Sequence, residues 1–235
     1  MSRRLALALS LATLPVFVAC GDTTSPAVPD AEPAARAFAI NGDYQSVTAS
    51  SVAADTLTVR FLTASGAPVT GLAVTWTADD ASELTPLQST TASDGTARAL
   101  FRADTKAGES EVTVASGAIN TQFHLNIVAA EAKRLQLMLA SVDTIEVGRT
   151  FTGAPVRITD EFGNSVSGGQ VSVTIFSNED TTPFATLTLS ANLDGVAALS
   201  DMPFPAGTHR IVYTLGAASV SYTVVVMGDT DPDGD

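Results

Sequence analysis

Apolar residues alternate with polar ones in several short stretches of this chain, and this period of two is the feature that most limits its fold. Successive side chains of a β-strand point to opposite faces, so such a stretch covers a core on one face and meets water on the other. Residues 131–140 favour helix by composition, but their leucines keep the period of two and predict a strand. Strands are also expected at residues 57–61, 74–76, 123–127, 171–175, 187–189 and 220–224.

Glycines beside Asp, Asn or small residues separate these stretches. Glycine reaches positive φ at low steric cost, so each break predicts a hairpin or a corner. Many short strands with such turns predict an all-β fold of the β-sandwich type. The glycines concerned are Gly42, Gly66, Gly95, Gly163, Gly195 and Gly216.

The breaks recur in the same order at nearly one spacing, which indicates an internal repeat. Two copies of a domain of about 95 residues explain the recurrence, and this size is typical of a sandwich domain. The equivalent pairs are Gly66 with Gly163 (97 apart), Asp94 with Asp194 (100 apart), and Gly108 with Gly207 and Gly117 with Gly216 (both 99 apart).

The first copy resembles the bacterial Ig-like domains found in tandem in invasin- and intimin-type adhesins. The resemblance rests on "GAPV" at 66–69, a strand at 74–77 with Trp76 at the second Val of the family's Val-x-Val-x pattern, "TASDGTA" at 91–97, and Gly108 followed by "VTVA" at 112–115. The second copy is similar at 158–168, "ITDEFGNSVSG", although Ser165 stands where Pro is usual. The resemblance covers about residues 38–227 and implies two tandem immunoglobulin-like sandwiches that act as spacers or display scaffolds.

The N-terminus carries an export signal. Arg3 and Arg4 precede a mainly apolar run at 5–18, which is typical of a signal peptide and too short to span a membrane. Residues 17–20, "FVAC", resemble the lipobox of bacterial lipoproteins, which implies lipidation of Cys20 after removal of residues 1–19. A soluble secreted protein cut one residue later is the alternative. Gly21 after Cys20 favours sorting to the outer membrane.

Charge excludes one class of partner. Loss of residues 1–19 lowers the 12 basic residues to 10 against 25 acidic ones, so the net charge falls from −13 to −15. Such a chain, without a basic cluster, repels phosphate backbones, and nucleic acid is not expected as a partner. As Cys20 is the one cysteine, no intrachain disulfide forms.

The expected organisation has five parts. A signal peptide at 1–19 precedes Cys20 and a Pro-containing tether at 20–36, which is rich in small residues and has little to bury. Ig-like sandwiches follow at 37–129 and 130–228, and an acidic tail closes the chain at 229–235.

No group of residues predicts catalysis or a cofactor. His124 and His209 lie in different copies and are expected at the surface, while Trp76 alternates with Val74 and is expected in the core. Carboxylate pairs do not suit a glycosidase, which draws its two carboxyls from separate strands, so they are interpreted as solvated loop charge. These pairs are Asp79 with Asp80, Asp160 with Glu161, and Glu179 with Asp180.

The tail offers a weak calcium candidate. Asp229, Asp231 and Asp233 followed by Gly234 match the first half of a calcium loop. The bidentate Glu of such a loop does not follow, so a plain acidic tail is the alternative.

These observations predict a lipid-anchored, non-catalytic protein of the cell envelope, in the outer membrane, which displays Ig-like modules for adhesion or for interaction with a protein or glycan. A structural spacer or accessory subunit of an envelope complex is the alternative. A glycan-acting enzyme is the third hypothesis.

Overall fold

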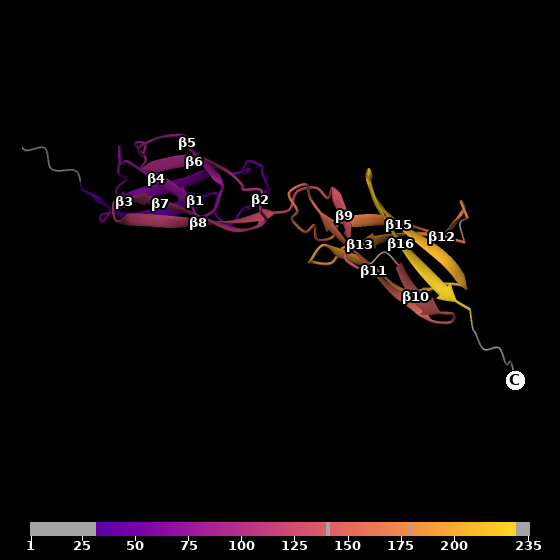
Figure 1. Cartoon of the computed structure of the whole chain (residues 1–235). Coiled ribbons are helices and arrows are strands. Elements are labelled where there is room, and N and C mark those ends of the chain that lie inside the picture. Colours follow the sequence, from indigo (N-terminus) through magenta and orange to yellow (C-terminus); the bar gives the residue numbers. More distant parts are fainter. Residues whose placement is uncertain (1–31, 140–141, 179, 229–235) are drawn as a thin grey trace, which may run out of the picture. The chain divides into compact units, whose positions relative to one another are not determined.

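The structure is a computed structural model that describes residues 32–139, 142–178 and 180–228. All regular elements of this part are β-strands (Figure 1), so the all-β prediction is confirmed. None of its elements is a helix that could cross a membrane. Cys20 and the aspartates 229, 231 and 233 lie outside the described residues.

The first sandwich contains eight strands in two sheets. One sheet has the order β1-β3-β6-β5 and the other β2-β8-β7-β4. Neighbours are antiparallel except β2, which runs parallel to β8. The strands are β1 (Ala34–Asn41), β2 (Ser46–Thr48), β3 (Leu57–Thr63), β4 (Thr75–Ala78), β5 (Glu83–Pro86), β6 (Thr96–Arg102), β7 (Gly108–Ser116) and β8 (Ile119–Val128).

The second sandwich repeats this plan. Its sheets have the orders β14-β11-β9 and β10-β16-β15-β12-β13, and β10 again runs parallel to β16. The strands are β9 (Arg134–Leu137), β10 (Val142–Glu146), β11 (Thr150–Thr159), β12 (Gln170–Ser177), β13 (Pro183–Ser190), β14 (Val196–Pro203), β15 (Gly207–Leu215) and β16 (Ala218–Met227).

The two copies differ in the sheet that one strand joins. β5 pairs with β6, whereas its counterpart β13 pairs with β12 over seven register positions. The long β12–β13 hairpin explains the change, because a continuous antiparallel ladder pairs more backbone groups than a crossing to the other sheet. Each of the remaining strands of the first sandwich has a counterpart eight places later in the same sheet position.

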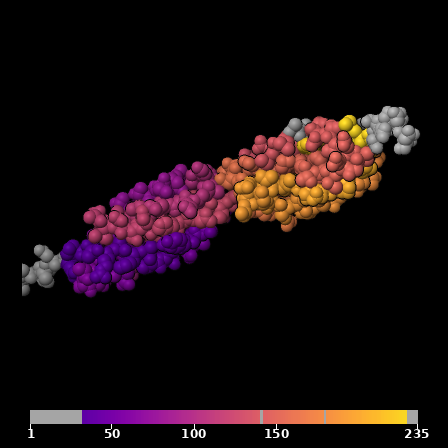
Figure 2. Space-filling model, turned by 90° about the horizontal axis from the view of Figure 1, so that it is seen from below, coloured from indigo at the N-terminus to yellow at the C-terminus, as the bar shows by residue number. Residues whose placement is uncertain are grey.

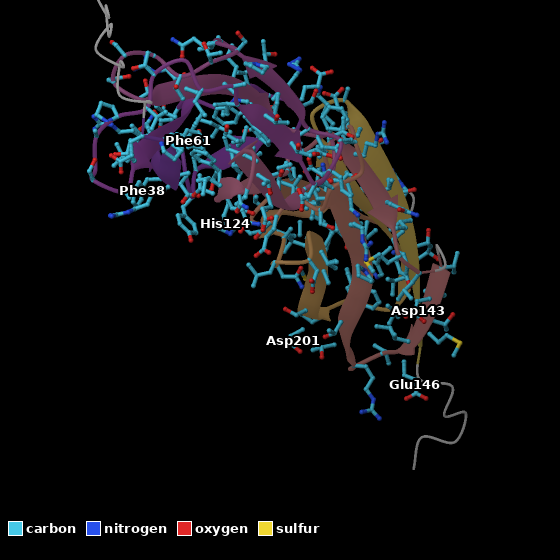
Figure 3. The ribbon with its side chains drawn as sticks, turned by 90° about the vertical axis from the view of Figure 1, so that its left-hand side faces the viewer. Phe38, Phe61, His124, Asp143, Glu146 and Asp201 are labelled. Carbon is cyan, nitrogen blue, oxygen red and sulfur yellow. The ribbon has the colours of Figure 1, made fainter. Side chains whose placement is uncertain are left out.

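Each sandwich has its own core, built from the alternating residues that the sequence singled out. Phe61, Phe101 and Phe123 are fully buried in the first, and Ile158, Ile175 and Tyr213 in the second. Burial of one such side chain contributes about 1.5–3 kcal/mol. Figure 3 shows Phe61 among the strands of the first sandwich, with His124 at its surface.

Strand β1 corrects the expected end of the tether. It begins at Ala34, inside the stretch 20–36 assigned to the tether, because Ala34, Ala37 and Ala39 pack against the core and β1 pairs with β3. Figure 2 shows the indigo N-terminal strands beside the rose strands of the 105–130 region on one surface of this sandwich. The sequence does not predict this strand, because its residues are small and do not keep a strict period of two.

The repeat extends to single backbone contacts. The Phe61 amide donates to the Gly95 carbonyl at 2.9 Å, and the equivalent Ile158 amide donates to the Gly195 carbonyl at 2.7 Å. Both glycines have positive φ, 77° and 72°. A Cβ on Gly95 would lie 2.6 Å from the Phe61 carbonyl oxygen, and one on Gly195 would lie 2.8 Å from that of Ile158.

We predict that Gly95→Ala lowers the free energy of unfolding by about 3 kcal/mol, because backbone must move to relieve the contact with Phe61. Gly66→Ala is the matched control, since its φ is 91° but nothing lies within 4 Å of the added Cβ. It should cost about 1–2 kcal/mol from backbone conformation alone. Urea denaturation measures both, and equal losses would contradict the close approach.

Candidate functional site

The outward face of the sheet β2-β8-β7-β4 holds an acidic hollow, which is the candidate functional site. Its volume is about 350 Å³, and Tyr44, Asp79, Glu109, Glu111 and His124 contribute to its lining. We call this set, with the adjacent Asp43, the acidic hollow.

Strand alternation places these side chains outside the core. On β7, Ser110 and Val112 are buried, so Glu109 and Glu111 between and beside them point outward. On β8, Phe123 and Leu125 are buried and His124 points outward. The sequence prediction that His124 faces solvent is therefore confirmed, with 49% of its side chain exposed.

Backbone contacts fix the loop that completes the hollow. The Asp43 carboxylate accepts hydrogen bonds from the amides of His124 at 2.7 Å and Tyr44 at 3.1 Å, and the Tyr44 amide donates to the His124 carbonyl at 2.7 Å. Tyr44 is held at a φ of 55°. Its ring stacks on the His124 ring with centroids 5.3 Å apart, although 79% of Tyr44 is exposed.

Carboxylates surround this pair of rings. The His124 Nδ1 lies 3.7 Å from Asp43 Oδ1, and its Nε2 lies 3.9 Å from Glu111 Oε2. The Glu111 amide donates to Asp79 at 2.8 Å, and Gln122 donates to the Glu111 carboxylate. Strands β2, β4, β7 and β8 contain no Lys or Arg. The exposed Tyr44 ring with carboxylates around it is suited to bind a cationic group.

The hollow lacks the geometry of a metal centre. Within residues 32–139, 142–178 and 180–228, no three His, Cys, Asp or Glu side chains group closely enough to hold a metal ion. Asp79 and Asp80 are exposed and follow β4, as their interpretation as solvated loop charge expects, and Asp79 in addition accepts the Glu111 amide and lines the hollow. The cross-strand neighbours that form the hollow are far apart in the sequence, and the alternation alone gives no signal for them.

His209 corrects a second prediction. The sequence predicts it at the surface, but it is fully buried in the second core. Its Nδ1 lies 2.9 Å from the Ser177 hydroxyl and its Nε2 lies 2.8 Å from the Pro205 carbonyl oxygen. The ring also packs on Phe204, with centroids 4.7 Å apart. Because β15 continues the inward alternation through Ile211 and Tyr213, the position of His209 is an inward one.

Trp76 is partly buried and packs against the first core, which confirms the prediction of a core residue. Its ring stacks on Phe123 with centroids 6.0 Å apart. Its Nε1 has no hydrogen-bond partner in the described part of the chain.

Asp160 follows β11 in a loop, but its charge is buried and not solvated as the sequence predicts. Its side chain is fully buried, and it accepts hydrogen bonds from the amides of Ala130, Phe162 and Asn164 and from the Asn164 side chain, at 2.8–2.9 Å. Asn164 also bonds the Thr105 carbonyl at 2.7 Å and the Ala107 amide at 2.8 Å. The neighbouring Glu161 is exposed and pairs with Lys133 at 3.4 Å. Glu179, of the third carboxylate pair, lies outside the described residues.

Two forces act in opposite directions on the pKa of Asp160. Burial raises it, but hydrogen bonds from Asn164, Ala130 and Phe162 outweigh burial and leave the pKa below its usual value. A lowered pKa in the folded state stabilises the protein above the unfolded pKa of about 4. That stability is lost as the pH falls through the folded pKa.

We predict that Asp160→Ala lowers the free energy of unfolding at neutral pH by about 3 kcal/mol, because four donors lose a charged acceptor. Glu161→Ala, which removes only an exposed ion pair, should cost less than about 1 kcal/mol. Denaturation at pH 7 and near pH 3 measures both variants. A loss for Asp160→Ala that stays constant over this range would contradict the role of the charge.

The comparisons with known proteins agree with this fold. Residues 37–128 match the family described as Bacterial Ig-like domain (group 1). The chain is 28% identical over 170 residues to the inverse autotransporter adhesin YeeJ of Escherichia coli. This alignment covers 68% of the chain and 7% of that adhesin. The first sandwich thus matches the bacterial Ig-like domain family, and the sequence resemblance to invasin- and intimin-type adhesins is confirmed.

Solved structures of adhesins share the architecture. The Escherichia coli adhesin FdeC matches with a TM-score of 0.54 and 16% identity over 84% of this chain and 66% of that one. InvD of Yersinia pseudotuberculosis matches with a TM-score of 0.51 and 16% identity over 85% and 60%. At these identities the likeness shows the fold alone. The chain spans 7% of YeeJ and less than two thirds of the InvD chain.

Proposed function

We propose that this protein is a lipid-anchored, non-catalytic lipoprotein of the cell envelope, which displays Ig-like sandwiches for adhesion. The observation that carries the proposal is the likeness of the chain to adhesins, together with an acidic, aromatic hollow on the first sandwich. The hollow presents Tyr44 and several carboxylates to solvent, and its chemistry suits recognition of a protein or glycan better than a reaction.

The anchor proposal rests on the sequence around Cys20. A diacylglycerol on its thiol would supply two acyl chains, and about two chains are needed for stable membrane attachment. The Pro-containing residues between Cys20 and β1 would then hold the first sandwich away from the membrane. Gly21 supports an outer-membrane location.

We predict that Cys20→Ser moves the protein from the membrane fraction to the soluble fraction, because the acyl chains have no other attachment site. Thr24→Ala, in the same segment, should leave the protein in the membrane. Fractionation followed by immunoblotting measures both. If Cys20→Ser stays with the membrane, lipidation is not the anchor.

Adhesion itself is tested with beads that carry residues 20–235 with Cys20→Ser. We expect these beads to bind cultured epithelial cells or bacteria that lack the protein, and we expect Tyr44→Ala with Glu111→Ala to reduce binding about tenfold or more, since interface hot spots include exposed Tyr. Beads that carry Glu131→Ala with Glu146→Ala, on the second sandwich, are the control. Absence of binding to both cell types would contradict adhesion and favour a structural spacer.

A further inference from the structure

The first sandwich carries a second charged surface, on the outward side of the sheet β1-β3-β6-β5. Its strands contain four arginines and one carboxylate, Glu83. Arg60, Arg98 and Arg102 point away from the core, because the residues beside them on β3 and β6 are buried. Arg36 is exposed next to a bulge in β1 and precedes the inward Ala37. We call the four arginines, with the apolar side chains among them, the basic face: Arg36, Arg60, Arg98 and Arg102.

These arginines form no close ion pair, although Glu83 stands opposite Arg102 in the β5–β6 ladder and Arg60 helps to lower the pKa of Asp94. Among the described residues, no Asp or Glu oxygen lies within 4.0 Å of any of their guanidinium nitrogens. Arg36 instead donates to the Ala64 carbonyl and Arg60 to the Asp94 carbonyl, both at 2.9 Å. Two aspartates, Asp55 and Asp94, flank the face from loops without forming ion pairs with it.

Large apolar side chains lie among the arginines. Phe38 stands opposite Arg60 in the β1–β3 ladder, and Leu100 lies between Arg98 and Arg102 on β6. Four such residues on this face are 38–51% exposed: Phe38, Ile40, Leu87 and Leu100. Ile40, Leu87 and Arg98 also line a hollow of about 480 Å³. Aromatic and Arg enrichment with few Lys, Glu or Asp is the composition of an interface core.

The acidic hollow belongs to the opposite side of the same sandwich. The two sheets pack through their inward residues, so their outward faces point in opposite directions. The outward face of β1-β3-β6-β5 carries four arginines. The outward face of β2-β8-β7-β4 has no Lys or Arg on its strands, and Asp43, Asp79, Glu109 and Glu111 lie there. A single sandwich therefore carries two surfaces of complementary charge.

We propose that the basic face of one copy of this protein docks on the acidic hollow of a second copy. An arginine placed there would stack on the exposed Tyr44 ring and form charge-assisted hydrogen bonds with Glu109 or Glu111. The chain itself supplies the complementary surface, which favours a second copy over an anionic glycan as the occupant. This inference goes beyond adhesion and depends neither on Cys20 nor on an external partner.

The contact joins two different surfaces, so it is heterologous. Each copy keeps one surface free after docking, and further copies add head to tail unless the rotation closes a ring. At about 0.15 M salt, charges more than about 8 Å apart are screened from each other. The attraction between the two facing surfaces can therefore outweigh the repulsion between two chains that are each negative overall.

Sedimentation velocity of residues 20–235 with Cys20→Ser tests the proposal. We expect association that grows with concentration at low salt and is lost at about 1 M salt, where the Debye length is about 3 Å. Arg98→Glu with Arg102→Glu should weaken association at least about tenfold, and so should Glu109→Arg with Glu111→Arg. Both pairs are on the surface, and circular dichroism checks that the variants fold.

Mixing gives the decisive outcome. The Arg98→Glu, Arg102→Glu variant keeps an intact acidic hollow, and the Glu109→Arg, Glu111→Arg variant keeps an intact basic face. The mixture should therefore form heterodimers at concentrations at which each variant alone is monomeric. Arg149→Glu with Arg157→Glu and Glu131→Arg with Glu146→Arg make the same charge changes on the second sandwich and should leave association unchanged. Wild-type protein that stays monomeric, or variants whose mixture stays monomeric, would overturn the proposal. So would binding of alginate, an anionic polysaccharide, by the basic face of a protein that does not self-associate.

Discussion

The alternation of inward and outward side chains is the constraint on which the rest of this structure depends. Phe61, Phe101 and Phe123 are buried because they occupy inward positions of three strands, and their neighbours in sequence are therefore directed to water. The outward positions are free of packing demands, so they can carry charge without cost to the core. In the first sandwich they carry arginine on one sheet and carboxylate on the other.

The two copies share a backbone plan but not a surface. The buried Asp160 occupies the corner that Thr63 occupies in the first copy. The Thr63 hydroxyl accepts a hydrogen bond from the Ala67 amide at 3.1 Å, and the Asp160 carboxylate accepts one from the Asn164 amide at 2.9 Å. The corner needs an acceptor, and either side chain supplies one. The charge separation, by contrast, is strong only in the first sandwich, because each sheet of the second mixes Arg with Asp or Glu on its strands.

The sequence predicts the fold class, the repeat, and the expected strands because each depends on local patterns that the structure keeps. Gly66, Gly95, Gly163 and Gly195 have the positive φ values that their turns predict. The acidic hollow is not predictable in this way, because Asp43, Asp79 and His124 meet through strand pairing over long sequence distances. The sequence misplaces His209 because Gly207 just before it suggests a turn, whereas β15 already begins at Gly207 and places His209 inward, opposite Val224 of β16. Cys20 is still a prediction.

The most direct test of the account is a dilution series of residues 20–235 with Cys20→Ser, followed through amide chemical shifts by NMR. If opposite faces of the first sandwich meet, signals from outward residues of β3 and β6 and from those of β7 and β8 should shift together with concentration, while signals of the second sandwich should stay constant. Shifts limited to one face, shifts limited to the second sandwich, or shifts that survive about 1 M salt would contradict the account.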